Sequence, residues 1–264
     1  MKTVRYIWAT AGCVLTTLWL AGCGGNGTAT GSLSGPNNPN NSPFPSTNRN
    51  RLYQHGDEFI YTVTGVAQYR GQRWEVSGTV TNRFTSVGAG VLRLHQVSQL
   101  TLRRGSDTLT HNFQRVFYIS QDRQSREVTL IGYADDENAP LINCNLPYKV
   151  VIPGILNENS NFSFSTMFED GTACTETWQI GTIESVETYA GKYYSYRMRV
   201  ESQWDEPVPF ADTICAGTGW FSPQLGCWTR IEILESTWRE SDPIEYRLTY
   251  ILNRTNVSLQ PPNL

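Results

Sequence analysis

The stretch IEYRLTYIL, Ile244 to Leu252, alternates apolar and polar side chains almost residue by residue. Successive side chains of a β-strand point to opposite faces of a sheet. The spacing therefore predicts a strand with one buried face and one face in water. The residues that share the predicted buried face are Ile244, Tyr246, Leu248, Tyr250 and Leu252.

The same period of two recurs along most of the chain, for example at Tyr194, Tyr196, Met198 and Val200. No stretch sustains the three-and-four spacing of an amphipathic helix. Short turn signals separate the predicted strands, and Asp-Gly is the strongest hairpin marker among them. They are Arg70-Gly71, Arg104-Gly105-Ser106, Asp122 to Ser125, Asp170-Gly171, Ala190-Gly191 and Ser241-Asp242-Pro243.

Several of these strands span ten or more residues, and sequential hairpins of this kind make an antiparallel meander. Long twisted strands in that number rarely stay flat. We expect an all-β fold in which a long-stranded antiparallel meander forms a strongly curved open sheet or a partial barrel. No linker interrupts residues 51–264, so this part is predicted to be a single all-β domain.

Four cysteines fall inside this domain, and an even number in an exported chain favours two disulfides, with three pairings open. Cys215 and Cys227 flank a turn with Ser222-Pro223 and Gly226, so they could face each other across one hairpin. Cys144 would then pair with Cys174. Zinc binding is the rival interpretation, but no C-x-x-C pair is present.

One segment of the domain resembles a known class of sequences. An A-G-x-[FY] hairpin, with Ala190, Gly191 and Tyr193, precedes a W-[FY]-[SA]-P-x-x-G turn from Trp220 to Gly226. This pairing is similar to one in uncharacterised bacterial exported proteins and lipoproteins. The resemblance implies the curved half-barrel sheet of lipoprotein-carrier-like proteins, with no established activity and no catalytic residues. The cysteines depart from that pattern.

The sequence offers little catalytic chemistry. Its three histidines, His55, His95 and His111, lack a metal spacing such as H-E-x-x-H, and no serine lies in a G-x-S-x-G elbow. His111 shares the parity of apolar neighbours, but a core histidine with a hydrogen-bond partner explains it best. We predict a protein that is not an enzyme and that needs no metal and no cofactor.

The aromatic residues leave two function classes open. One is a noncatalytic structural or assembly module in which they fill the core, which is the preferred interpretation. The alternative is a binder or carrier of an apolar ligand on the concave face of the sheet. The possible ligand-facing residues are Trp178, Tyr194, Tyr196, Trp228, Tyr246 and Tyr250.

The N-terminus has the three parts of a secretory signal: Lys2 and Arg5, an apolar run from Tyr6 to Leu20, and small residues. Leu20-Ala21-Gly22-Cys23 resembles the lipobox of bacterial lipoproteins. The resemblance implies a signal peptide over residues 1–22 and lipid on the sulfur of Cys23. Gly24 stands where lipoproteins kept at the inner membrane usually carry Asp, which favours a lipid anchor in the outer membrane of the cell envelope.

Residues 23–50 are predicted to be the lipidated cysteine and a disordered tether, because Asn, Gly, Pro and Ser dominate and few apolar side chains occur. Loss of Lys2 and Arg5 with the signal would leave a net charge of about −5. Nucleic acid is therefore not an expected partner, since it requires a basic surface. The expected partners are the membrane, through the lipid, and an envelope protein or apolar ligand.

Overall fold

The computed structural model describes residues 48–69, 71–88, 90–205, 212–238 and 244–257. This part of the chain is all-β, and it contains no helix long and apolar enough to cross a membrane. Thirteen strands are present: β1 (Glu58–Tyr69), β2 (Gln72–Gly88), β3 (Val91–Arg104), β4 (Asp107–Gln121), β5 (Val128–Ala134), β6 (Ile142–Asn143), β7 (Lys149–Ile152), β8 (Asn161–Met167), β9 (Ala173–Thr188), β10 (Gly191–Asp205), β11 (Asp212–Ser222), β12 (Cys227–Trp238) and β13 (Ile244–Thr255).

The strands form one antiparallel sheet in the order β6-β5-β4-β3-β2-β1-β13-β12-β11-β10-β9-β8, and β7 also pairs with β5. Nearly every neighbour in the sheet is a neighbour in the chain, as a meander requires. Besides the β5–β7 pair, the exception is the pairing of β1 with β13, which sets Thr64 opposite Thr249 and Ala67 opposite Tyr246. The first and last strands therefore meet in the middle of the sheet.

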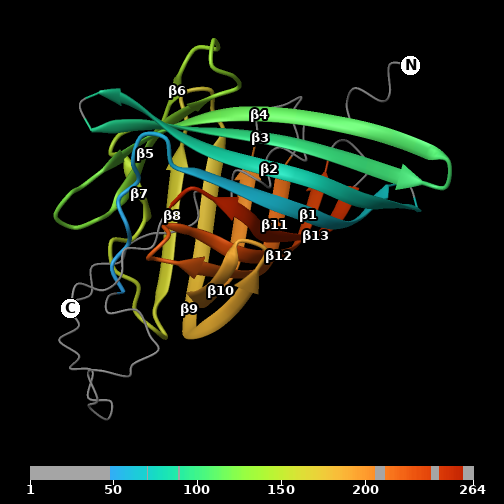
Figure 1. The fold of residues 1–264 in the computed structure, drawn as a ribbon. Helices are drawn as coiled ribbons and strands as arrows, with labels where there is room; N and C mark the ends of the chain where they lie inside the picture. Colours follow the sequence, from blue (N-terminus) through green and yellow to red (C-terminus); the bar gives the residue numbers. More distant parts are fainter. Residues whose placement is uncertain (1–47, 70, 89, 206–211, 239–243, 258–264) are drawn as a thin grey trace.

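The sheet is strongly curved, and its two halves cross. In Figure 1 the long strands β1 to β4 run across the molecule, while β8 to β10 run steeply down behind them. The two ends of the sheet touch at one bridge, between Cys144 and Phe168. There the amide of Asn145 donates to the carbonyl of Met167, with 2.7 Å between nitrogen and oxygen. This architecture confirms the predicted all-β, strongly curved open sheet.

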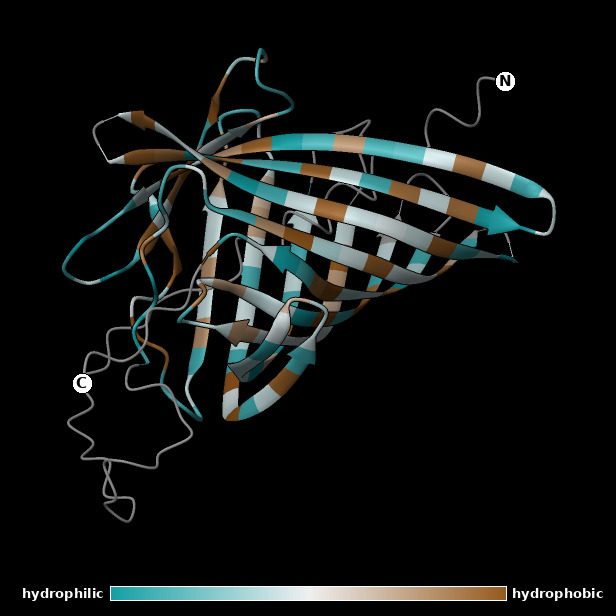
Figure 2. Ribbon diagram, viewed as in Figure 1, coloured by the Kyte–Doolittle hydropathy of each residue, from teal (hydrophilic) through white to brown (hydrophobic). Residues whose placement is uncertain are grey.

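Alternation along the strands sends one set of side chains to the inner face. On β8 every second residue is buried, and the same banding of polar and apolar residues follows β1 to β4 in Figure 2. The predicted buried face of Ile244 to Leu252 is confirmed at Tyr246, Leu248, Tyr250 and Leu252. The largest fully buried side chains include Trp178, Trp204, Trp228, Tyr246, Tyr250, Phe59, Phe84, Phe117 and Phe168.

Close packing at this face depends on glycine at β11. An added Cβ at Gly219 would lie 2.3 Å from Cζ3 of Trp228, because the indole lies directly against the glycine backbone. The two residues belong to the β11–β12 hairpin, in which Phe221 also lies opposite Trp228. The glycine thus gives the large ring a place within a curved, close-packed layer.

The folded part begins earlier than the predicted boundary at residue 51. Asn48 Nδ2 donates to the carbonyl of Leu156 at 2.8 Å, and the amide of Asn50 donates to the carbonyl of Gly154 at 2.8 Å. Asn50 is buried. Residues 48–50 are therefore held by the 154–156 segment, whereas the predicted signal peptide and the remainder of the tether lie outside the described residues.

Candidate functional site

The six aromatic residues predicted as possible ligand-facing groups all lie on β9, β10, β12 and β13. Five of them are buried almost completely on the inner face, and only Tyr194 is half-buried. The exposed fractions of the five are 0% for Trp178, 3% for Tyr196, 2% for Trp228, 1% for Tyr246 and 2% for Tyr250.

These rings contact other core rings. The centroids of Trp178 and Trp228 are 5.2 Å apart in an edge-to-face arrangement, and those of Phe221 and Trp228 are 5.4 Å apart. Such distances are typical of favourable aromatic pairs in protein cores. Around Trp228 the inner face is therefore occupied by the protein's own side chains.

A row of polar residues also crosses this inner face. Glu176 on β9 lies opposite Ser202 on β10, Ser202 lies opposite Cys215 on β11, and Cys215 lies opposite Glu235 on β12. Residues directly opposite each other share a face of the sheet. Both glutamates are at most 1% exposed. We name these four residues, Glu176, Ser202, Cys215 and Glu235, the buried polar row.

Sequence reasoning missed this row, although the signal was present. Glu176 stands two residues before Trp178, and Glu235 stands two residues after Ile233, so both have the parity of core residues. On the strands most other acidic residues, such as Glu75, Glu201 and Glu245, are exposed. A glutamate in phase with buried aromatic residues is therefore the feature that predicts a buried carboxyl.

Burial raises the pKa values of two members of the buried polar row, Glu176 and Cys215. The indole Nε1 of Trp178 donates to Oε1 of Glu176 at 2.5 Å, which favours the ionised form, but desolvation dominates and raises the pKa of Glu176 well above 4.5. The pKa of the Cys215 thiol is raised by burial first and then by Glu235 and Glu176. A protonated carboxyl beside a protonated thiol is poorly suited to nucleophilic chemistry, which requires the thiolate.

The structure shows no disulfide among the four cysteines of the domain, which are all free and buried. Cys215 lies opposite Glu235, whereas Cys227 lies opposite Ser222, seven residues further along β11. At about 3.3 Å per residue the two cysteines are roughly 23 Å apart. A disulfide needs Cα atoms within about 7 Å. The hairpin was predicted correctly, but the pairing within it was not.

Cys144 and Cys174 lie near each other without a bond. Cys144 bridges to Phe168, just after β8, while Cys174 pairs with Thr166 of β8 on the other side of that segment. Two strand spacings amount to about 9 to 10 Å. Burial raises the pKa of the Cys144 thiol to about 12, so this side chain is an unreactive core group.

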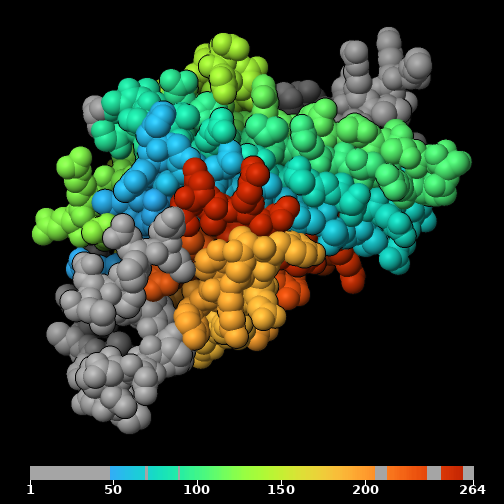
Figure 3. Space-filling view, in the orientation of Figure 1, coloured from blue at the N-terminus to red at the C-terminus, as the bar shows by residue number. Residues whose placement is uncertain are grey.

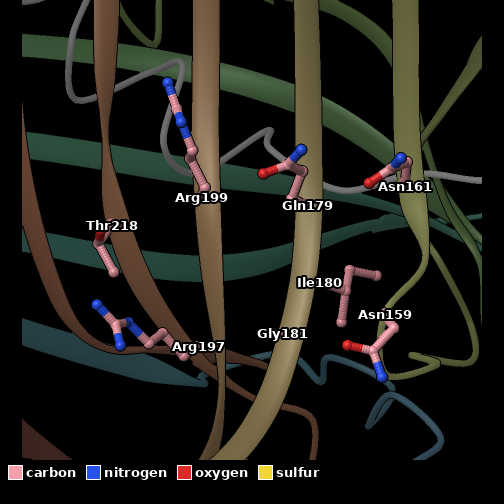
Figure 4. Close-up of a pocket in the computed structure, with 8 residues that line it drawn as sticks. All are labelled: Asn159, Asn161, Gln179, Ile180, Gly181, Arg197, Arg199 and Thr218. Atoms are coloured by element: carbon pink, nitrogen blue, oxygen red, sulfur yellow. The ribbon is translucent and has the colours of Figure 1, made fainter.

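The outer face carries a shallow depression of about 470 Å³ across β8 to β11, shown in Figure 4. Arg197 and Arg199 project into it. Each has an acidic neighbour, since Arg199 pairs with Glu201 at 2.8 Å and Arg197 with Glu184 at 3.7 Å. These arginines belong to a solvated network of surface charges.

A second outer depression, of about 580 Å³, includes Glu58, Arg83 and His95. His95 contacts Glu137 at 2.9 Å through Nδ1 and Thr85 at 2.9 Å through Nε2. The pKa of His95 is lowered from its usual value, because the effect of burial is larger than the opposite effect of Glu137. Within the described ranges no three His, Cys, Asp or Glu residues are grouped to hold a metal ion.

No protein-family model matches the sequence, and no curated protein matches it. Three solved structures align with most of the chain. A predicted exported protein with a YmcC-like fold from Bacteroides fragilis is 13% identical, with 79% of this chain and 99% of that chain covered and a TM-score of 0.38. A predicted lipoprotein from Parabacteroides distasonis is 12% identical, with 80% and 100% covered and a TM-score of 0.36.

The hypothetical lipoprotein YmcC from Escherichia coli is 9% identical, with 75% of this chain and 89% of that chain covered and a TM-score of 0.27. These TM-scores are below 0.5, so the similarities support no conclusion about what this chain does. The functional argument therefore depends on the chain's own residues.

Glu176→Gln tests whether the buried carboxyl is neutral. The amide has nearly the same shape and can still accept the hydrogen bond of Trp178. Because the folded-state pKa is raised, the unfolded chain loses its proton first, and stability falls with rising pH above 4.5 by up to about 1.4 kcal/mol per unit. Urea unfolding between about pH 5 and about pH 8 should show a smaller loss of stability in Glu176→Gln than in the parent.

Glu187→Gln is the matched control, since Glu187 is exposed on the same strand. It should reproduce the pH dependence of the parent. Equal slopes for Glu176→Gln and the parent would show that Glu176 is ionised in the folded protein.

Proposed function

We propose that this chain is a lipid-anchored protein of the bacterial cell envelope whose curved sheet acts as a noncatalytic structural or assembly module. The filled inner face is the observation that supports this proposal most strongly. Five of the six aromatic residues that could have lined a ligand cavity are at most 3% exposed and belong to one core cluster.

A carrier of apolar molecules needs open space inside its sheet. Ligand cavities typically measure about 300 to 1,000 Å³ and are lined mainly by apolar side chains. Trp178 and Trp228 instead pack edge to face at 5.2 Å, and Trp228 contacts Gly219 across the hairpin. The two depressions described above lie on the outer face and contain charged side chains such as Arg197, Arg199 and Arg83. The packing thus favours the structural role over the carrier.

The titratable groups also favour a noncatalytic role. Inside, Glu176 and Cys215 are kept neutral by burial. Outside, the charged residues stand in ion pairs such as Arg230 with Glu232 and Arg83 with Glu58. On the outer surface the side chains of β1, β13 and the β9–β10 hairpin form a continuous surface in the view of Figure 3.

The anchor is proposed from Leu20-Ala21-Gly22-Cys23. The folded part is attached at Asn48, next to Leu156, so about 25 residues separate it from the lipid. A flexible chain of that length has an end-to-end distance of about 25 to 30 Å. The tether would therefore allow the end of the sheet that holds Asn48 to lie close to the membrane surface, with outer-membrane attachment favoured by Gly24.

Cys23→Ser tests the anchor. Thioether attachment of lipid needs the sulfur of this residue, so the variant should lose labelling by radioactive palmitate and detergent-phase partitioning. Cys13→Ser is the matched control, because this cysteine lies in the predicted signal peptide and its loss should leave labelling intact. An unsubstituted chain that carries no label would refute the lipid anchor.

Binding of an apolar fluorophore tests the filled inner face. The folded protein, after lipid extraction, should show no saturable binding at low micromolar concentration. Tyr196→Ala should simply lower the free energy of unfolding, by about 3 kcal/mol, as a core truncation. Tyr189→Ala is the control, because Tyr189 is 67% exposed. Saturable binding by the parent that a folded Tyr196→Ala variant lacks would establish a ligand carrier instead.

A further inference from the structure

Four buried oxygen atoms on the inner face have no hydrogen-bond partner within the described part of the chain. They are Oε2 of Glu176, Oγ of Ser202 and the phenol oxygens of Tyr246 and Tyr250. Each of these four residues is at most 4% exposed. Buried polar atoms are nearly always hydrogen-bonded, because an unsatisfied one loses its hydration without compensation. Four such atoms on one face therefore point to a ligand that the protein's own groups do not replace.

Three of the four residues lie along one line across the sheet. Glu176 lies opposite Ser202, and both belong to the buried polar row. At the other end of that row Glu235 lies opposite Tyr246. Directly opposite residues share a face, so Tyr246 continues the row onto β13.

Tyr250 reaches the same region from further along β13. The pKa of Tyr250 is raised by burial first and then by Glu235, Cys215 and Tyr246, so its phenol lies close to these three groups. The curvature of the sheet contributes, because β9 comes close to β12 and β13 as well as to its paired neighbours. We name the buried polar row together with Tyr246 and Tyr250 the interior polar cluster.

Short side chains form the centre of the interior polar cluster. Ser202 on β10 lies opposite Cys215 on β11. The carboxyls of Glu235 and Glu176 both approach the Cys215 thiol, since each of them raises its pKa after burial does. Long polar side chains thus surround two short ones. A serine and a cysteine take up less volume than the leucine or phenylalanine usual in a core, and a water molecule needs only about 30 Å³.

Water is the ligand whose chemistry fits these atoms. Trp178 donates to Oε1 of Glu176, which leaves Oε2 to carry the proton of the neutral carboxyl and to act as a donor. The hydroxyls of serine and tyrosine both donate and accept. A water molecule can accept from one of these groups and donate to another, and a buried water typically makes about three such bonds.

We propose that the interior polar cluster is a water-binding site, in which water molecules held inside the core bridge Oε2 of Glu176, Oγ of Ser202 and the phenols of Tyr246 and Tyr250. In the sheet order β13 is three strands away from β10, so these waters connect strands that do not pair with each other. They fasten the curved sheet across its polar part, as the aromatic rings do around Trp228. The proposal goes beyond the envelope role proposed above and does not depend on it.

Two substitutions of nearly the same shape at Ser202 test the site in the full chain. Threonine keeps the hydroxyl, whereas valine has a methyl group in its place, so strain from the added atoms is common to both variants. A hydroxyl bound to water contributes a hydrogen bond, but a dry, unpaired hydroxyl lowers stability. Ser202→Val should therefore unfold at a lower urea concentration than Ser202→Thr.

Tyr250→Phe tests the opposite side of the site, because it removes the phenol oxygen and nothing else. The variant should unfold at a lower urea concentration than the parent, since a bound water loses one of its partners. Tyr189→Phe is the matched control. Tyr189 is 67% exposed, so this change should leave the urea midpoint where it is.

Magnetic relaxation dispersion of water detects the ligand itself. The method reports water molecules that stay inside a protein for longer than the protein takes to tumble. The parent and Ser202→Thr should both show such long-lived waters, and Ser202→Val should show fewer. Far-UV circular dichroism establishes that each variant is folded.

The proposal requires all three results. It would be overturned by a urea midpoint of Ser202→Val that equals or exceeds that of Ser202→Thr, or by a Tyr250→Phe variant at least as stable as the parent. Equal numbers of long-lived waters in the parent and in a folded Ser202→Val variant would also overturn it, because the hydrogen bonds of Ser202 would then lead to other groups.

Discussion

A sheet with one apolar face must cover that face with a second layer, and this chain supplies no helix in its described part to do so. The covering layer is therefore the other half of the same sheet. Strong curvature follows from this requirement, because only a curled sheet brings its own inner faces together. The pairing of β1 with β13 in the middle, and the bridge between Cys144 and Phe168 at the ends, connect the two halves.

The same constraint limits what the inner face can do. Side chains that close a core at high packing density occupy the space that a ligand cavity would need. Trp178, Trp228 and Tyr250 are large enough to fill the space between the two halves, and glycine at position 219 lets the indole of Trp228 approach the backbone. Glu176 is accommodated there because burial keeps its carboxyl protonated and Trp178 donates a hydrogen bond to it.

Local patterns predicted the strands, since the period of two in Ile244 to Leu252 depends only on neighbouring residues. They also predicted the turn after β11, where Pro223 and Gly226 end one strand and prepare the next. Cysteine pairing could not be predicted in this way, because it depends on register: Cys227 begins β12 immediately after the turn, whereas Cys215 lies seven residues before the end of β11. The position of a turn can thus be predicted correctly while the predicted pairs of facing residues are wrong.

Contacts between residues that lie far apart in the sequence could not be predicted for a similar reason. The partner of β1 is the last strand, nearly two hundred residues away, and no short motif encodes that contact. The length over which β5 pairs with β4, from Val116 to Gln121, is also a tertiary property. The buried polar row was readable from parity alone, but only if Glu176 and Glu235 were treated as core positions. The lipid anchor at Cys23 lies outside the described residues and stays a prediction.

The account's central claim is that the inner face is the protein's own close-packed core. A double-mutant cycle on Trp178 and Trp228 in urea unfolding tests it most directly. We predict that each substitution by alanine lowers the free energy of unfolding by about 3 to 5 kcal/mol, with a coupling of about 0.5 to 1.5 kcal/mol between the two rings. Variants that unfold at the same urea concentration as the parent, with no coupling, would contradict the account.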